Sequence, residues 1–220
     1  MTSQVVPMPN LQEESRPAMR AFRGATALPS ILGMYAFAAA TFLVAARMAN
    51  WYGNAHSAIV LFPLVLFLGG LAQFYAGAWA FRMNDAVALA MHGTWGSFWT
   101  AYGILELLYA SGRVVRPQGA FPELGFWFIV VAAITWAITA ASRENKGITS
   151  LLALLAIGST LEAIAELAGI GWLRMLAGYF LIASALVAWY VASALIMRFG
   201  RTAQAQSATP AAPSESVHAA

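Results

Sequence analysis

The chain has 220 residues, of which 60% are hydrophobic and only 10% are charged, and its formal net charge is +3. Soluble domains usually carry about 25% charged residues, so this composition excludes a largely water-exposed surface and indicates an integral membrane protein. The chain has no cysteine, which excludes disulfides and thiolate sites, and its low net charge argues against a nucleic-acid partner.

The two ends of the chain differ in composition from the rest. Residues 1–28 hold acidic and basic side chains among prolines and small polar residues, which predicts a cytoplasmic N-terminal tail. No small-residue cleavage site is evident, so the first apolar run reads as a retained span. Residues 29–200 form the predicted transmembrane domain. Residues 201–220 are rich in Ala, Ser, Pro and Gln and are predicted to be a disordered C-terminal tail.

Between the tails the apolar runs are long enough to cross a bilayer. A spanning helix needs roughly 20 apolar residues to cover about 30 Å of hydrocarbon. The sequence therefore predicts an all-α membrane protein, a compact bundle of six transmembrane helices in the cell membrane. The predicted spans are 29–49, 57–81, 86–110, 121–141, 148–168 and 171–197.

The positive charges predict the orientation of the bundle. Cytoplasmic loops carry an excess of Lys and Arg. With the N-terminus inside, eight of the 12 basic residues lie on the cytoplasmic side and four on the other, so both termini are predicted to be cytoplasmic. The inner set is Arg16, Arg20, Arg23, Arg82, Arg143, Lys146, Arg198 and Arg201, and the outer set is Arg47, Arg113, Arg116 and Arg174.

Polar residues inside the spans are functional candidates, because a buried polar group in a bilayer needs a partner or a role. Gln73, near the middle of the second span, either lines a pathway or ties two helices together. The third span is the most polar and contains His92. This histidine is either a proton relay or a structural residue bonded to a neighbouring helix.

Three carboxylates also fall within the spans, in the outer third of the predicted bundle: Glu106, Glu162 and Glu166. Glu162 and Glu166 are one helical turn apart and repel each other unless they are paired or hydrated. Two interpretations stay open. The glutamates form interhelical ion pairs with the outer arginines around a water-filled vestibule, or one of them is a proton or anion site that works in transport.

Signatures of enzymes and metal sites are absent from the sequence. It has no Gly-rich phosphate loop with its Lys and no nucleophile motif. The three histidines, His56, His92 and His218, are scattered, which argues against a metal or haem site. We therefore expect a protein that is not an enzyme and has no cofactor.

Two motifs resemble the acetate uptake transporter family, the succinate–acetate permease group of bacteria and fungi. The second span contains Gly69-Gly70-Leu-Ala-Gln73 followed by Gly77, and the third contains Trp95-Gly-Ser97-Phe-Trp99. The family carries Gly-Gly-x-x-Gln-x-x-x-Gly and Tyr-Gly-(Ser/Ala)-Phe-Trp at these places. The chain departs from the family at Trp95, where a tyrosine is usual, and in the signature ahead of the first span.

The resemblance implies a protomer with its own pore that assembles as a homohexamer. It also implies an apolar constriction built from an aromatic of the first helix, the tyrosine of the third and a leucine of the fifth. In this sequence they correspond to Tyr35, Trp95 and Leu155. Such a neck excludes hydrated ions but passes a small acid that is protonated or briefly desolvated. Gln73 and Ser97 are expected to line the same path.

The sequence thus predicts a transporter or channel for acetate and similar small monocarboxylates, linked to protons, with lipid and a small carboxylate as partners. Two alternatives stay open. One is a pore for a small neutral or weakly basic solute such as ammonia, which Trp95 and His92 motivate. The other is a non-transporting sensor or scaffold that keeps the same fold.

Overall fold

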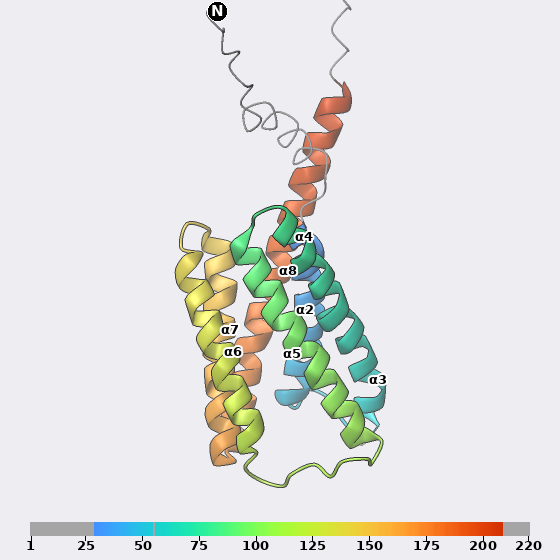
Figure 1. Cartoon of the computed structure of the whole chain (residues 1–220), viewed down its shortest axis with the longest axis vertical. Coiled ribbons are helices and arrows are strands. Elements are labelled where there is room, and N and C mark those ends of the chain that lie inside the picture. The colour runs from blue at the N-terminus through green and yellow to red at the C-terminus, as the bar shows by residue number, and fades with distance from the viewer. Residues whose placement is uncertain (1–28, 55, 209–220) are drawn as a thin grey trace, which may run out of the picture.

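The protein, represented by a computed structural model, is described over residues 29–54 and 56–208, with side chains up to residue 201. The predicted N-terminal tail, residues 1–28, lies outside the described residues. The described residues form helices and no strand (Figure 1). In chain order the helical elements are α2 (Pro29–Met48), α3 (Ser57–Leu64), the π-helical η1 (Val65–Ala72), α4 (Gln73–Arg82), α5 (Ala86–Ala110), α6 (Pro122–Ala141), α7 (Lys146–Ala168) and α8 (Gly171–Ala208).

The helices fall where the apolar runs predicted them. Within the described residues, five helices are long and apolar enough to cross a membrane: α2, the column from Ser57 to Arg82, α6, α7 and α8. The helix α5 has 25 residues but is not among the five, in keeping with its many polar side chains. The all-helical membrane fold is therefore confirmed, with five or six candidate spans.

The second span is a single column made of α3, η1 and α4. Pro63 lies inside α3 and has no backbone N–H to donate to the preceding turn. The chain continues as the π-helical turns of η1, where Gly69 and Gly70 are buried. A β-carbon on Gly96 of α5 would lie 3.2 Å from the carbonyl oxygen of Gly70, so the two backbones approach closely here. This approach brings the two motif-bearing segments of the sequence together.

The helices form a closed ring. The helix α2 packs on α8 and on the α3–η1–α4 column, α8 on α7, α7 on α6, and α5 between α6 and the column. Figure 1 shows the helices running along the long axis of the molecule, with the α5–α6 connection at one end. Side chains that point toward the axis of the ring therefore share one interior.

Local signals in the loops explain where the helices begin and end. The side chain of Asp85 accepts a hydrogen bond from the backbone N–H of Ala88 and caps α5, and Asn145 caps α7 in the same way. Pro122 opens α6, where a missing N–H has no consequence. Gly169 ends α7 with φ at 68°, a conformation that favours glycine.

The last helix is longer than the sequence predicted. The transmembrane domain was expected to end at residue 200 and to be followed by a disordered tail from 201. Instead α8 continues to Ala208 and extends beyond the other helices in Figure 1. Alanine and glutamine are good helix formers, so a helix that is already nucleated can propagate through 201–208 without an apolar face. Residues 209–220 lie outside the described residues.

Candidate functional site

A charged cavity of about 200 Å3 opens at the end of the bundle where α2, α5 and α7 finish and α8 begins. We call it the charged vestibule and define it by Arg47, Arg116, Glu162, Glu166 and Arg174. Three arginines from α2, the α5–α6 loop and α8 therefore line one cavity. Each of their guanidinium groups is ion-paired with a buried glutamate of the same cluster.

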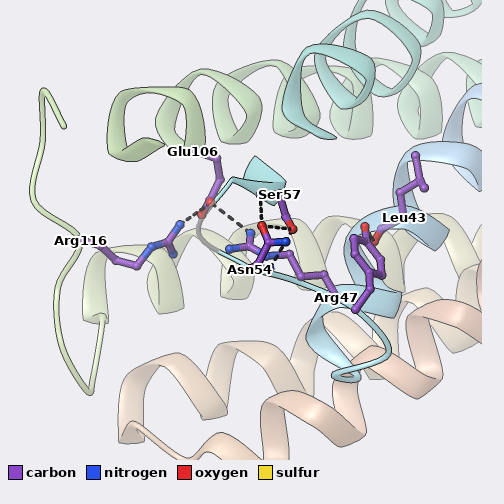
Figure 2. A network of polar contacts seen from close by, with 7 residues as sticks. Leu43, Arg47, Asn54, Ser57, Glu106 and Arg116 are labelled. Carbon is purple, nitrogen blue, oxygen red and sulfur yellow. Dashed lines mark hydrogen bonds and ion pairs between the residues drawn. The ribbon is translucent and has the colours of Figure 1, made fainter. Parts of the chain in front are cut away.

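Two arginines hold Glu106 at the wall of the vestibule. Its carboxylate is buried, and its Oε2 atom lies 3.4 Å from Nη1 of Arg47 and is also paired with Arg116. Figure 2 shows the two guanidiniums approaching this carboxylate from opposite sides. Burial alone would lower the pKa of the Arg116 guanidinium, but its hydrogen bond to Glu106 and the charge of that carboxylate raise it. The α5–α6 loop, which carries Arg116, is thereby tied to the vestibule.

On the opposite wall two carboxylates share one arginine, whereas Glu106 is held by two. Glu162 and Glu166 are both buried, and both are held by Arg174 of α8, with Nε 3.6 Å from Oε1 of Glu162 and Nη2 2.7 Å from Oε1 of Glu166. The second carboxylate oxygen of Glu162 has no hydrogen-bond partner. The interhelical ion pairs that the sequence offered as one interpretation are present. The proton or anion role of these glutamates stays a prediction.

Below the vestibule the interior narrows to a gap of about 10 Å3, which we call the aromatic gap. It is lined by Thr41 of α2 and by Trp95, Phe98, Trp99 and Tyr102 of α5, among others. Val44, Met48 and Tyr102 line the gap and the vestibule alike. The two spaces are therefore consecutive along the interior, and the second is almost filled by side chains.

Trp95 closes the gap. Its side chain is 1% exposed and lies edge-on against Phe37 of α2, with ring centroids 6.0 Å apart. Its indole N–H donates to the hydroxyl of Thr135 on α6, at 3.1 Å. Leu155 of α7 is fully buried in the same apolar core. We call Trp95 and Phe37 the neck, and the place of Leu155 in the constriction stays a prediction. The two neck side chains offer an ion no polar group other than the N–H that Thr135 already accepts.

A second cavity of about 320 Å3 lies at the other end of the bundle, and we call it the inner cavity. Its lining includes Met34 of α2 and Met91 of α5, each about one helical turn from a neck residue, together with Asp85, Glu144 and Asn145. Charged vestibule, aromatic gap, neck and inner cavity thus follow one another along the ring's interior. A small solute would have to displace side chains at the gap and at the neck.

Two of the predicted pathway residues, Tyr35 and Ser97, do not lie along this series of spaces. Tyr35 is half-buried, and its hydroxyl lies 2.9 Å from Oγ of Ser193 on α8, so the α2 aromatic beside Trp95 is Phe37. Ser97 is exposed on the outer side of α5, where its hydroxyl donates to the carbonyl of Gly93. Both residues lie within one turn of an inward-facing residue, and the sequence does not distinguish which side of the helix faces inward.

Gln73 and His92 are fully buried next to each other. The amide nitrogen of Gln73 donates to the carbonyl of Gly69 at 2.8 Å, and its oxygen lies 3.5 Å from Nδ1 of His92. The His92 ring also packs closely against Gly33 of α2, and its Nε2 atom has no partner. This pair links the α3–η1–α4 column to α5 and α2, as expected for the structural interpretation of both residues. Neither residue lines the gap or the inner cavity.

Sequence reasoning did not single out Phe37 and Thr135 as site residues. Phe37 is one of many apolar residues in α2, so no local signal distinguishes it. Thr135 is a polar residue in the apolar helix α6, and the general cost of burying a hydroxyl offered a signal for it.

Comparisons with known proteins agree with this architecture. The model of the GPR1/FUN34/yaaH family matches residues 12–208. The chain belongs to this family. The predicted membership of the acetate uptake transporter family is therefore confirmed, and the chain is a multi-pass cell-membrane protein.

Two relatives and one solved structure illustrate the similarity. The succinate-acetate/proton symporter SatP of Escherichia coli K12 is 28% identical over 182 residues, which cover 79% of this chain and 92% of that protein. Ammonia transport outward protein 2 of Saccharomyces cerevisiae is 25% identical over 170 residues, which cover 76% of this chain and 60% of that protein. The structure of the bacterial acetate channel SatP matches with a TM-score of 0.71 at 22% identity, covers 85% of this chain and 99% of that one, and shows a shared fold.

Proposed function

We propose that this protein moves acetate and similar small monocarboxylates across the cell membrane through the interior of the helix ring. The observation that carries the proposal is the order of spaces along that interior, from the charged vestibule through the aromatic gap and the neck to the inner cavity. The neck rejects an ion that keeps its hydration shell. The name of the SatP relative supports the substrate class.

Proton linkage is part of the proposal. A carboxylate has no partner for its charge at Trp95, whose one N–H is already engaged by Thr135. Crossing as the neutral acid removes the desolvation penalty of the charge. The proton then travels with the substrate, as it does in a symporter.

The proposal places the vestibule on the outer side of the membrane and both chain termini in the cytoplasm. The uneven distribution of Lys and Arg supports this orientation. Assembly as a homohexamer is likewise a proposal, based on the family resemblance. Native mass spectrometry of the detergent-solubilised protein tests the assembly, and protease accessibility of tags on both termini tests the orientation.

The function is tested by uptake of labelled acetate into proteoliposomes, with and without an inward proton gradient. We expect uptake that rises with the gradient and that depends less on the gradient in Trp95→Ala, because opening the neck lets acetate pass with its hydration shell. Trp136→Ala is the matched control, since Trp136 is 44% exposed on α6 and lies away from the interior path. An absence of uptake by folded wild-type protein would reject the proposal and leave a sensor or scaffold that shares the fold.

A second candidate function is passage of ammonia. The observation that favours it is the apolar neck, where a neutral solute needs no partner for a charge. The names of the yeast relatives point in the same direction. Alkalinisation of a pH dye inside liposomes after an ammonium pulse tests it. Flux of ammonia without flux of acetate, changed in Trp95→Ala and unchanged in Trp136→Ala, would favour this function over the first.

A further inference from the structure

Two buried polar atoms in the aromatic gap lack hydrogen-bond partners. The hydroxyl of Thr41 on α2 and the indole N–H of Trp99 on α5 have none, although Thr41 is 1% exposed and Trp99 is 3% exposed. Both residues line the same gap of about 10 Å3. An unpaired buried donor or acceptor costs about 1–3 kcal/mol, so two of them on residues that line one space need an explanation.

Comparable residues elsewhere in the described helices do find partners. Thr135, Thr139 and Ser159 each donate to the carbonyl four residues earlier, at 2.6, 2.7 and 2.8 Å. The indole groups of Trp95 and Trp136 each donate to a threonine hydroxyl. The unpaired state of Thr41 and Trp99 is therefore not a general property of hydroxyls or indoles in this bundle.

The positions of the two residues in the fold are also related. Thr41 follows the neck residue Phe37 by four positions on α2, and Trp99 follows the neck residue Trp95 by four positions on α5. Residues four apart lie on the same face of a helix. Each unpaired group therefore lies one helical turn from the neck, on the side of the vestibule, and the two come from different helices.

We propose that Thr41 and Trp99 form a binding site for the carboxyl group of the permeating acid, just before the neck. In this site the Trp99 N–H donates to the carbonyl oxygen of the protonated acid, and the O–H of the acid donates to the hydroxyl oxygen of Thr41. The site takes small neutral solutes that carry both a donor and an acceptor. This site rests on the proposed function, within which Thr41 and Trp99 select the substrate just before the neck.

The size of the gap fits this role. A volume of about 10–15 Å3 is what one water molecule requires, so water can satisfy the two groups when no acid is bound. An acid that enters must displace this water and move neighbouring side chains. Met48, which lines the gap and the vestibule, is unbranched and able to adapt.

The test compares Thr41→Val and Trp99→Phe with wild type in acetate uptake by proteoliposomes. Each change removes one hydrogen bond to the substrate, and we expect the half-saturation concentration to rise about two- to tenfold. The melting temperature should not fall in Thr41→Val, because the removed hydroxyl had no protein partner. The matched controls Thr139→Val and Trp136→Phe remove groups that are bonded within the protein, and they should leave the half-saturation concentration unchanged. Thr41→Ser keeps the hydroxyl and should restore wild-type uptake.

An unchanged half-saturation concentration in both variants, with acetate uptake intact, would overturn the site but not the proposed function. If the wild type takes up no acetate, the proposed function fails, and a second measurement decides the site. Acetamide is a neutral isostere of acetic acid. A rise in the wild-type melting temperature with acetamide that is lost in both variants supports the site, and no rise overturns it.

Discussion

Trp95 of α5 and Thr135 of α6 are joined inside the bundle by a hydrogen bond from the indole N–H to the hydroxyl oxygen, at 3.1 Å. Thr135 is fully buried, and its own hydroxyl proton is donated to the carbonyl of Val131. The bond fixes the orientation of the bulkiest neck residue. It also links α5 to α6, which are further held together by Phe98 of α5 packing against Trp127 and Phe128 of α6.

We predict that Thr135→Val destabilises the protein. The valine has nearly the same shape but leaves the Trp95 N–H buried without an acceptor, which costs about 1–3 kcal/mol. Thermal unfolding of the purified protein in detergent measures the effect. Thr160→Val breaks the equivalent bond to the half-exposed Trp136 and should lower the melting temperature less. Equal effects of the two substitutions would contradict this account.

We predict that Trp95→Tyr changes selectivity in favour of larger acids. Tyrosine is smaller than tryptophan, so the neck against Phe37 widens, and its hydroxyl can still bond Thr135. Succinate passage should rise relative to acetate passage, measured as the ratio of the two uptake rates in proteoliposomes. Trp136→Tyr serves as the control with the same side-chain exchange on the outer surface. An unchanged ratio in Trp95→Tyr would show that Trp95 does not set the width of the neck.

We predict that Gly69→Ala strongly destabilises the bundle. A β-carbon at Gly69 would lie 2.6 Å from that of Ala40 on α2 and 2.8 Å from Cγ of Trp99, so helices must move apart. Such overpacking typically costs about 1–3 kcal/mol. Gly93 on α5 is the matched control, because a β-carbon there meets nothing within 4 Å. Gly93→Ala should be neutral or slightly stabilising, since alanine is favoured over glycine in a helix.

We predict that Arg174→Gln lowers the melting temperature and that Glu166→Gln in the same chain restores part of it. The single change leaves two buried carboxylates without their shared cation, and removing one of them relieves repulsion. We expect about 1–3 kcal/mol for the single change, less than the roughly 3–5 kcal/mol of a fully buried pair, because the Arg174 side chain is 40% exposed and solvent screens its charge. Arg113→Gln is the control, because Arg113 is exposed in the α5–α6 loop. No recovery in the double variant would mean that Glu166 does not depend on Arg174.

The sequence alone predicted the membrane class and the positions of the helices. A bilayer demands long apolar segments with their backbone groups bonded internally, and the apolar runs report that demand directly. The capping residues Asp85 and Asn145 and the terminating Gly169 act through local geometry, and they place the helix ends in the sequence. The two motifs of the second and third spans indicated the family, which the comparisons confirm.

The candidate site was predictable only in part, because membrane helices are apolar on every side. Tyr35 and Phe37 lie two positions apart on α2, and no amphipathic stripe shows which of them faces the ring's interior. The structure places Phe37 against Trp95 and turns Tyr35 to Ser193. The same ambiguity led to Ser97 being assigned to the pathway.

The arrangement of the charged residues was likewise predictable only in part. The sequence placed three glutamates and four arginines at one end of the bundle, since loop and helix order determine the depth of each residue. Which arginine meets which glutamate depends on helix rotation and on the path of the α5–α6 loop, which brings Arg116 to Glu106. The sequence by itself therefore determined how deep each group lies in the membrane. Only the packing of the ring decided which groups face one another, because that choice is made by contacts between residues far apart in the chain.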